Sequence, residues 1–379
     1  MSRNATLRQA PILSKWQEPE PEETRLLVQL ARDDVSPETL RWAAQRVVDD
    51  QLDEGFFRLL PALYPHFERQ GVSHPGLPRI RGLYRLARAR GLMITQAASN
   101  FADVMHSHGE PVLLLKGLAL AHEYYHDLGT RPMHDADLMV PEQLNALRVE
   151  EILAAGGGWK REGSLVFQRA MKYRHPSGVA LDLHRHLFDH SIRPQLSESL
   201  WARAQIMHLG DYRVLALSPE HQVFHAIIHG LPSNFVSPFR WIVDVGRVLN
   251  QRDVSWAMVV DTAVEYRLTS MLATGLNWLA RNGLSPRITV PAADNPVDLA
   301  LQRGLVKPHS ARERANQRGR SSRMITWHWH LPRRLLSLRG QTWSAAAHAE
   351  VVRSRWGPEE TVKGKALGVA KRSLLASRP

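Results

Sequence analysis

The chain contains no cysteine. This absence excludes a disulfide framework, zinc sites with thiolate ligands and a cysteine nucleophile, and it is typical of proteins from a reducing compartment. Long apolar segments are also missing: no run approaches the roughly 18 uninterrupted apolar residues of a membrane-spanning helix. The N-terminal residues lack the apolar centre of a secretory signal. We therefore predict a cytoplasmic protein with no transmembrane segment.

Acidic residues are scarce near the C-terminus. The 379 residues include 49 Lys and Arg and 37 Asp and Glu, a formal net charge of +12. Residues 311–379 contain 15 basic and 4 acidic residues, so the rest of the chain is nearly neutral and its charge gives no support to nucleic-acid binding. In this tail arginines interleave with tryptophans, which suits an acidic partner such as RNA or an anionic membrane. We favour the alternative, a helical appendage whose tryptophans pack on the protein, because the tail lacks a clean amphipathic period.

The remaining sequence divides by the spacing of its apolar residues. Helical spacing begins near residue 22, includes a capping Ser36 before Pro37, and ends with a long amphipathic segment at 79–107. Short apolar runs typical of buried strands follow, and helical spacing returns at Ser218. We predict an α+β fold, a small mixed β-sheet core flanked by N- and C-terminal helical regions. The predicted segments are a flexible leader (1–21), a helical region (22–107), the core (108–210), a second helical region (211–310) and the basic tail (311–379).

Within the core, apolar runs and turn residues predict four strands and two helices. The strands are expected at 111–115, 135–140, 165–174 and 179–187, the last two joined by a hairpin turn, and the helices at 118–125 and 141–155. Beyond Ser218, helices are expected to about residue 282, with a last short one near residue 305.

Three aspartates in the core point to metal chemistry. Asp135 and Asp137 are two residues apart on a predicted strand, so their side chains project to the same face. Asp182 lies on a later predicted strand and joins them if the two strands are neighbours. Three carboxylates suit Mg²⁺, which binds through a few carboxylates together with substrate phosphates. Such a site neutralises charge on a triphosphate and activates an attacking hydroxyl, with Asp182 best placed to take the proton.

The Asp-x-Asp pair has two other interpretations. One is a solvated turn. Three observations argue against it: the apolar strand around the pair, the third carboxylate Asp182, and the preceding Lys116-Gly117 turn. The other is a metal-dependent glycosyltransferase. That class needs a nucleotide-binding α/β domain before the motif, whereas residues 1–107 are predicted to be helical.

Three stretches of the core carry a resemblance to a known family. They are Leu113-Leu-Leu-Lys-Gly-Leu-Ala-Leu, Arg131-Pro-Met-His-Asp-Ala-Asp-Leu-Met-Val and Leu181-Asp-Leu-His. In this order they resemble a bacterial family of uncharacterised nucleotidyltransferases within the polymerase-beta-like superfamily. The resemblance covers about residues 80–250 and leaves the basic tail outside.

The resemblance implies a nucleotidyltransferase core with a defined set of ligands. Asp135 and Asp137 would be the metal ligands, with Asp182 as the third carboxylate, for Mg²⁺ or Mn²⁺. Lys116 and Gly117 stand where the wider superfamily has a Gly-Gly or Gly-Ser turn that holds the nucleotide phosphates. The implied reaction transfers a nucleoside monophosphate from a triphosphate such as ATP to a hydroxyl or phosphate. The family's association with biosynthetic gene clusters implies an acceptor that is a peptide, glycan or small molecule.

Four further residues lie near these motifs. Arg131 is predicted to contact the triphosphate or, with equal weight, to pair with a core aspartate and orient it. His134 and His184 flank the carboxylates and could orient them. Arg240 could reach the nucleotide from the second helical region, although its spacing from Asp244 most simply predicts a salt bridge within one helix.

His225 and His229 have the i, i+4 spacing of a zinc pair on a helix. No glutamate follows His225 as in a metalloprotease motif, so packing in the core is the preferred interpretation.

Two rival functions remain open. The acceptor could be tRNA or another RNA, as in toxin-like nucleotidyltransferases, with the basic tail providing affinity; steep salt dependence of binding would indicate this. Alternatively, the chain could be a non-catalytic binding module on the same fold, against which the complete carboxylate set argues.

Overall fold

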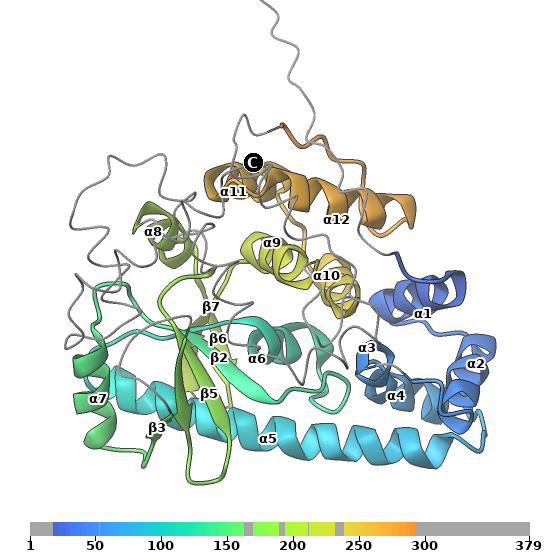
Figure 1. Ribbon diagram of the computed structural model, residues 1–379, viewed down its shortest axis with the longest axis horizontal. Coiled ribbons are helices and arrows are strands. Elements are labelled where there is room, and N and C mark those ends of the chain that lie inside the picture. Colours follow the sequence, from blue (N-terminus) through green and yellow to red (C-terminus); the bar gives the residue numbers. More distant parts are fainter. Residues whose placement is uncertain are drawn as a thin grey trace, which may run out of the picture.

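The computed structural model describes residues 18–52, 54–162, 170–188, 194–210, 212–231 and 239–292. The predicted basic tail, the predicted helix near residue 305, residues 1–17 of the predicted leader and residues 165–169 of a predicted strand lie outside the described residues. The described part is an α+β fold, with helices on either side of one mixed sheet (Figure 1). None of its helices combines the length and apolarity that a bilayer crossing requires.

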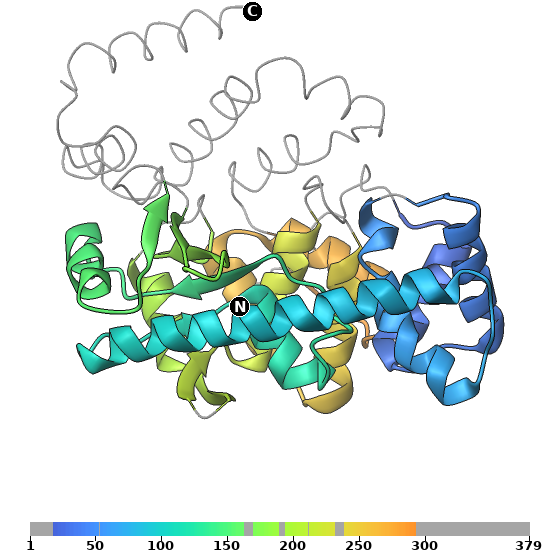
Figure 2. The same ribbon diagram turned by 90° about the horizontal axis from the view of Figure 1, so that it is seen from below.

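In the described residues, five helices precede the sheet: α1 (Pro21–Arg32), α2 (Pro37–Val48), α3 (Glu54–Phe57), α4 (Leu60–Gln70) and α5 (Leu77–Ser107). The predicted start of α2 is confirmed, because the Ser36 side chain accepts a hydrogen bond from the Thr39 backbone N–H. The long predicted helix is confirmed as α5, whose 31 residues correspond to ~46 Å at the usual helical rise. It runs along the molecule beneath both the sheet and the N-terminal helices (Figures 1 and 2).

The sheet has seven strands in the order β3-β4-β5-β2-β1-β7-β6. Two neighbouring pairs run parallel, β2 with β5 and β1 with β7, and the other pairs are antiparallel. The register of β2 and β5 places Asp137 directly opposite Asp182, so the two predicted ligand strands are neighbours. The strands are β1 (Leu113–Leu114), β2 (Asp135–Met139), β3 (Lys160–Glu162), β4 (Met171–Arg174), β5 (Ala180–His184), β6 (Gln205–Leu209) and β7 (Tyr212–Ala216).

Several elements differ from the predictions. The hairpin β6–β7 was not predicted, since β6 is an edge strand that exposes three of its five residues and so lacks a clear apolar alternation. Because β7 lies beyond residue 210, the sheet extends past the predicted end of the core. The helix expected at 118–125 begins at Lys116 as α6 (Lys116–Leu120) and continues as the π-helix η1 (Ala121–Tyr125). The helix expected at 141–155 is α7 (Ala146–Ala154), because Asn145 caps it through the Arg148 backbone N–H.

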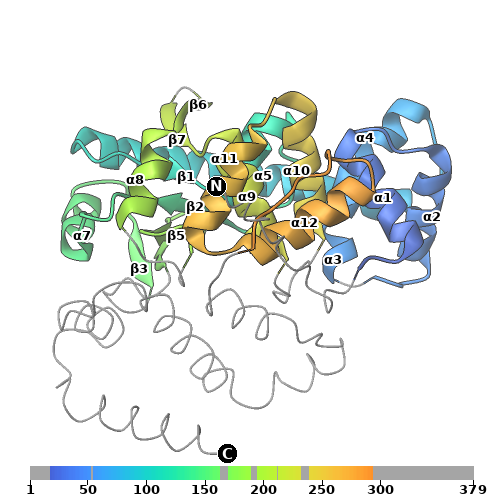
Figure 3. The same ribbon diagram turned by 90° about the horizontal axis from the view of Figure 1, so that it is seen from above.

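The C-terminal helices form a layer on the side of the sheet opposite α5. They are α8 (Pro194–Ala202), α9 (Pro219–Gly230), α10 (Arg240–Gln251), α11 (Trp256–Tyr266) and α12 (Thr269–Arg281). α11 and α12 cover α9 on its outer side (Figures 1 and 3). α10 packs closely on α1 at Gly246, where an added Cβ would lie 2.4 Å from the Ala31 Cβ.

The core consists of two apolar clusters. One joins the N-terminal helices α1, α2 and α4 to the C-terminal helices α9–α12, so the two ends of the described chain share a core. The other lies between the sheet, α7 and the second half of α5. The strands β1 and β2 contribute to both clusters, and their position is therefore fixed from both faces.

Candidate active site

The predicted site residues line one cavity of about 440 Å³, which we call the carboxylate cavity. This volume is in the range of small-molecule sites. Its walls come from the β1–α6 turn, the β2 and β5 strands, and the helices α9 and α10. All nine predicted site residues are among those that line it: Lys116, Gly117, Arg131, His134, Asp135, Asp137, Asp182, His184 and Arg240.

Asp137 is the most constrained of the three aspartates. Its Oδ1 accepts hydrogen bonds from Lys116 Nζ at 2.5 Å and from His184 Nε2 at 3.0 Å. Burial opposes ionisation of this carboxyl, but Lys116 and His184 outweigh burial and hold its pKa well below the ordinary value. Asp137 is thus a buried, ionised carboxylate that already attracts one cation, the Lys116 ammonium.

Asp137, Asp182 and His184 form a group able to hold a metal ion. One ligand atom from each lies within 4.8 Å of the others, and no further such group of three occurs among the described residues. The distance from Lys172 Nζ to Asp182 Oδ1 is 3.9 Å, so Asp182 has only a loose ion pair. The sequence had assigned His184 a supporting role, but the geometry places it among the possible ligands.

Asp135 stands slightly apart from this group. It lies two residues before Asp137 on the same strand and lines the same cavity. Burial raises the pKa of Asp135, and the neighbouring Asp137 and Asp182 raise it further, while Lys116 partly opposes them. The three aspartates therefore repel one another, as expected of carboxylates arranged around a cation.

The turn between β1 and α6 requires a specific backbone. Lys116 has a positive φ of 47°, which is uncommon for a residue with a side chain. At Gly117, an added Cβ would lie 2.7 Å from Arg131 Nη1 and 3.2 Å from Met133 Cγ. Gly117 therefore lets the Arg131 guanidinium lie directly against this turn.

Arg131 is held by the C-terminal helices. Its Nε and Nη2 donate to the two carboxylate oxygens of Asp244 on α10, both at 2.8 Å. Tyr125 also donates to Asp244, at 2.6 Å, and burial followed by the charge of Asp244 raises the pKa of this phenol. Arg131 Nη1 is buried and has no hydrogen-bond partner among the described residues. The pairing with a core aspartate was one of the two predicted alternatives, but that aspartate is Asp244 and not a carboxylate of the metal group.

Arg240 occupies a different position from the one its spacing suggested. The predicted salt bridge within α10 is replaced, because Asp244 pairs with Arg131. Arg240 Nη1 instead donates to the Pro132 carbonyl at 3.1 Å, and burial together with the charge of Arg131 lowers the pKa of Arg240 to about 10. Arg240 thus stabilises the position of the segment that leads into β2.

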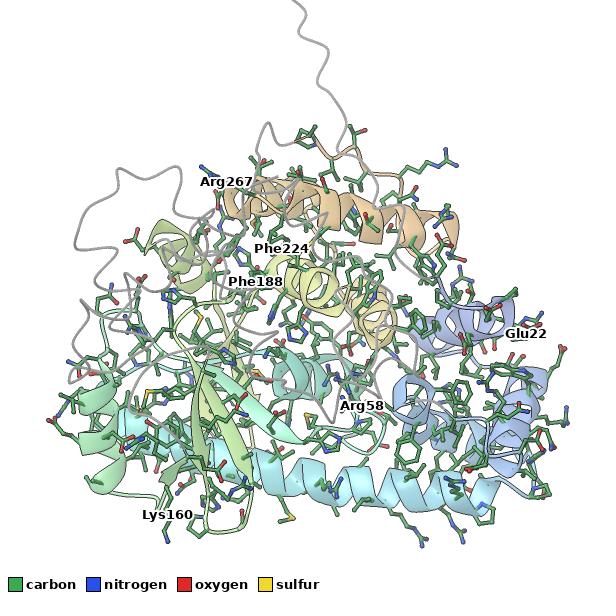
Figure 4. The ribbon with its side chains drawn as sticks, in the orientation of Figure 1. Glu22, Arg58, Lys160, Phe188, Phe224 and Arg267 are labelled. Atoms are coloured by element: carbon green, nitrogen blue, oxygen red, sulfur yellow. The ribbon has the colours of Figure 1, made fainter. Side chains whose placement is uncertain are left out.

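Arg58 and His225 also line the cavity, although neither was among the predicted ligands. Arg58, which follows α3, reaches the cavity wall although no motif surrounds it in the sequence. In Figure 4 it lies between the N-terminal helices and β2. His225 on α9 also lines the cavity; its ring packs on Phe188 at a centroid distance of 5.3 Å, and burial lowers its pKa well below the ordinary value. The preferred packing interpretation for His225 agrees with this environment.

The chain is similar to known nucleotidyltransferase-like sequences and structures. A search of curated proteins gave no match. Among solved structures, the chain is similar to the crystal structure of an antigenic nucleotidyltransferase-like protein from Paracoccidioides brasiliensis, with 16% identity, a TM-score of 0.38, and coverage of 50% of this chain and 87% of that one. The model of a family described as uncharacterised nucleotidyltransferase matches residues 57–282, more than half of the chain. The protein therefore belongs to this family of uncharacterised nucleotidyltransferases.

Proposed function

We propose that the protein transfers a nucleoside monophosphate from a metal-bound nucleoside triphosphate to an acceptor hydroxyl or phosphate. The observation that carries this proposal is the meeting of two kinds of group in one cavity. Carboxylates that suit a cation lie on β2 and β5, and basic groups that suit phosphates lie beside the Lys116-Gly117 turn. Membership of a nucleotidyltransferase family supports it.

The donor set fits a divalent cation. Asp137 and Asp182 supply oxygen ligands on adjacent strands, and Asp135 adds a third carboxylate two residues away. Mg²⁺ accepts such oxygens, and the nearby His184 makes Mn²⁺ a suitable alternative. Such a cation would neutralise charge on the triphosphate and on the departing pyrophosphate.

The basic residues have separate tasks in this proposal. The buried Arg131 guanidinium, which lies against Gly117 and is oriented by Asp244, would place a positive charge close to phosphates bound over the turn. Lys116 contacts Asp137 across the turn and would move its ammonium from this carboxylate to the phosphates. Catalysis would then rest on positioning and charge neutralisation.

The proposed transfer step exchanges one phosphorus–oxygen bond for another. An acceptor oxygen forms a bond to the α-phosphorus, the bond from the α-phosphorus to the bridging oxygen breaks, and pyrophosphate leaves with that electron pair. When the acceptor is a hydroxyl, its proton would pass to Asp182, whose side chain lines the cavity, is 23% exposed and lies 3.9 Å from Lys172 Nζ. A carboxylate within reach of the acceptor hydroxyl can act as the general base.

Isothermal titration calorimetry of ATP, GTP, CTP and UTP, each with Mg²⁺, tests the proposal. One triphosphate is expected to bind the wild type, and binding should disappear in the variant Asp135→Ala/Asp137→Ala. Asp261→Asn is the matched control, because Asp261 is an exposed carboxylate on α11 outside the cavity. If no triphosphate binds the folded wild type at millimolar concentration, the enzyme proposal fails and a non-catalytic binding module replaces it.

A further inference from the structure

A second cavity of about 420 Å³ adjoins the carboxylate cavity, and we call it the arginine groove. It is lined by residues of α3, α4 and the first half of α5, together with residues that precede β2. The two cavities share four lining residues, Arg58, Pro132, Met133 and His134. Because His134 immediately precedes Asp135, the groove meets the carboxylate cavity at the start of β2.

One face of α5 forms the floor of this groove. Arg79, Leu83, Leu86 and Arg90 recur at intervals of three and four residues, so they project to the same side of the helix. Leu86 is 47% exposed and Phe57, which also lines the groove, is 38% exposed, although both are large apolar residues. The floor thus offers an apolar centre with a guanidinium at each end.

The charge of the groove is positive where it meets the carboxylate cavity. Asp50 is the single carboxylate among the described lining residues, and it pairs with Arg79 at 3.2 Å at the far end. At the junction, Arg58 and His134 line both cavities, and Arg90 lines the groove together with them. An anion at this point would be attracted by both guanidinium groups.

We propose that the arginine groove binds the acceptor, and that the acceptor is a small molecule with an apolar body and an anionic group, phosphate or carboxylate. This inference rests on the proposed nucleotidyl transfer. The apolar body would cover Leu86 and Phe57, and the anion would lie between Arg90 and Arg58, beside the junction with the carboxylate cavity. The cavity volume matches a small molecule and not a folded RNA.

Phenyl phosphate is a suitable probe, because it combines a ring with an anion. We expect it to bind the wild-type protein in calorimetric titrations while Mg²⁺ and the triphosphate that the protein binds are present at saturation, and benzyl alcohol to bind much more weakly. Arg90→Glu should weaken phenyl phosphate binding about tenfold or more, the loss expected of one charge-assisted contact. Leu86→Ser should weaken it as well.

Arg85→Glu is the matched control. Arg85 is an exposed arginine on α5, on the side away from the groove, and this charge reversal should leave binding unchanged within about twofold. Arg90 and Leu86 are themselves exposed, so their variants are expected to fold.

The outcomes separate the two proposals. If a triphosphate binds but phenyl phosphate does not, or if Arg85→Glu weakens phenyl phosphate as much as Arg90→Glu does, the acceptor site is refuted while nucleotidyl transfer stands. If Arg90→Glu weakens binding of that triphosphate about tenfold, the groove holds the distal phosphates of the nucleotide and the acceptor inference is again refuted. If none of the four triphosphates binds, the proposed function fails, and the acceptor role fails with it.

Discussion

The buried pair Arg131–Asp244 offers the sharpest test of the architecture around the site. Arg131 and Asp244 are 3% and 5% exposed, and two hydrogen bonds of 2.8 Å join them. Asp244→Ala would leave the Arg131 charge buried without its partner, which costs about 3–5 kcal/mol. This is a large part of the ~5–15 kcal/mol that stabilises a typical domain. The urea midpoint should therefore fall by about 1–2 M.

Urea unfolding followed by circular dichroism measures this change, and two comparisons interpret it. Arg148→Ala removes the exposed pair between Arg148 and Glu151, 3.3 Å apart, and should cost at most ~0.5 kcal/mol. The double variant Arg131→Met/Asp244→Leu replaces the buried pair by apolar side chains and should recover most of the stability. It should nevertheless bind the nucleoside triphosphate weakly, because it lacks the positive charge of Arg131 beside the cavity.

The stability that Asp244 contributes depends on pH with a definite sign. Burial alone would raise the pKa of Asp244, but Arg131 outweighs burial and lowers it. The stability contributed by this carboxylate is therefore present above the ordinary value of 3.8 and is lost as the pH falls below it. A loss below about 1 kcal/mol for Asp244→Ala at neutral pH, or a double variant no more stable than the single one, would refute the reasoning.

Three further predictions concern the cavity. Gly117→Ala should destabilise the protein by about 1–3 kcal/mol and weaken triphosphate binding, because the Cβ of the alanine would collide with Arg131. An unchanged calorimetric affinity for the triphosphate would contradict this. Asp135→Asn should raise the melting temperature of the metal-free protein at neutral pH and reduce the further stabilisation by Mg²⁺. The reason is that the pKa of Asp135 is raised in the folded protein, so its ionised form costs stability as the pH rises. A lower melting temperature of the variant would exclude this account. His184→Gln should weaken Mn²⁺ binding about 10–100-fold, since His184 contacts Asp137. A Mn²⁺ titration indistinguishable from that of the wild type would show that His184 does not contribute to the metal site.

Local patterns predicted the parts of the structure that local forces determine. The i, i+2 spacing of Asp135 and Asp137 and the apolar runs around them placed the carboxylates on strands, and Asp182 does lie on the neighbouring strand. The capping Ser36 likewise predicted the start of α2, and the amphipathic period of residues 79–107 predicted the helix α5.

The remaining features depend on contacts between distant segments. Arg131 and Asp244 are 113 residues apart, and the i, i+4 spacing of Arg240 and Asp244 suggested a nearer partner for this aspartate. Arg58 has no motif around it and becomes part of the site because it lines the cavity together with residues 132–134, which precede β2. The β6–β7 hairpin was missed because its edge strand has a weak apolar pattern.

The single helix α5 joins two structural environments with separate constraints. Its second half packs Ala98, Phe101 and Met105 under the sheet, while its first half forms the floor of the arginine groove. An insertion of one residue between the halves would rotate one face against the other by roughly 100° and separate the groove from the carboxylates without altering the composition of either. Substitutions at Arg79, Leu83, Leu86 or Arg90, in contrast, leave the sheet contacts intact. If the groove binds the acceptor as proposed, substitutions there would change the acceptor while the carboxylate framework stays unchanged, and the continuity of this helix would keep the two in register.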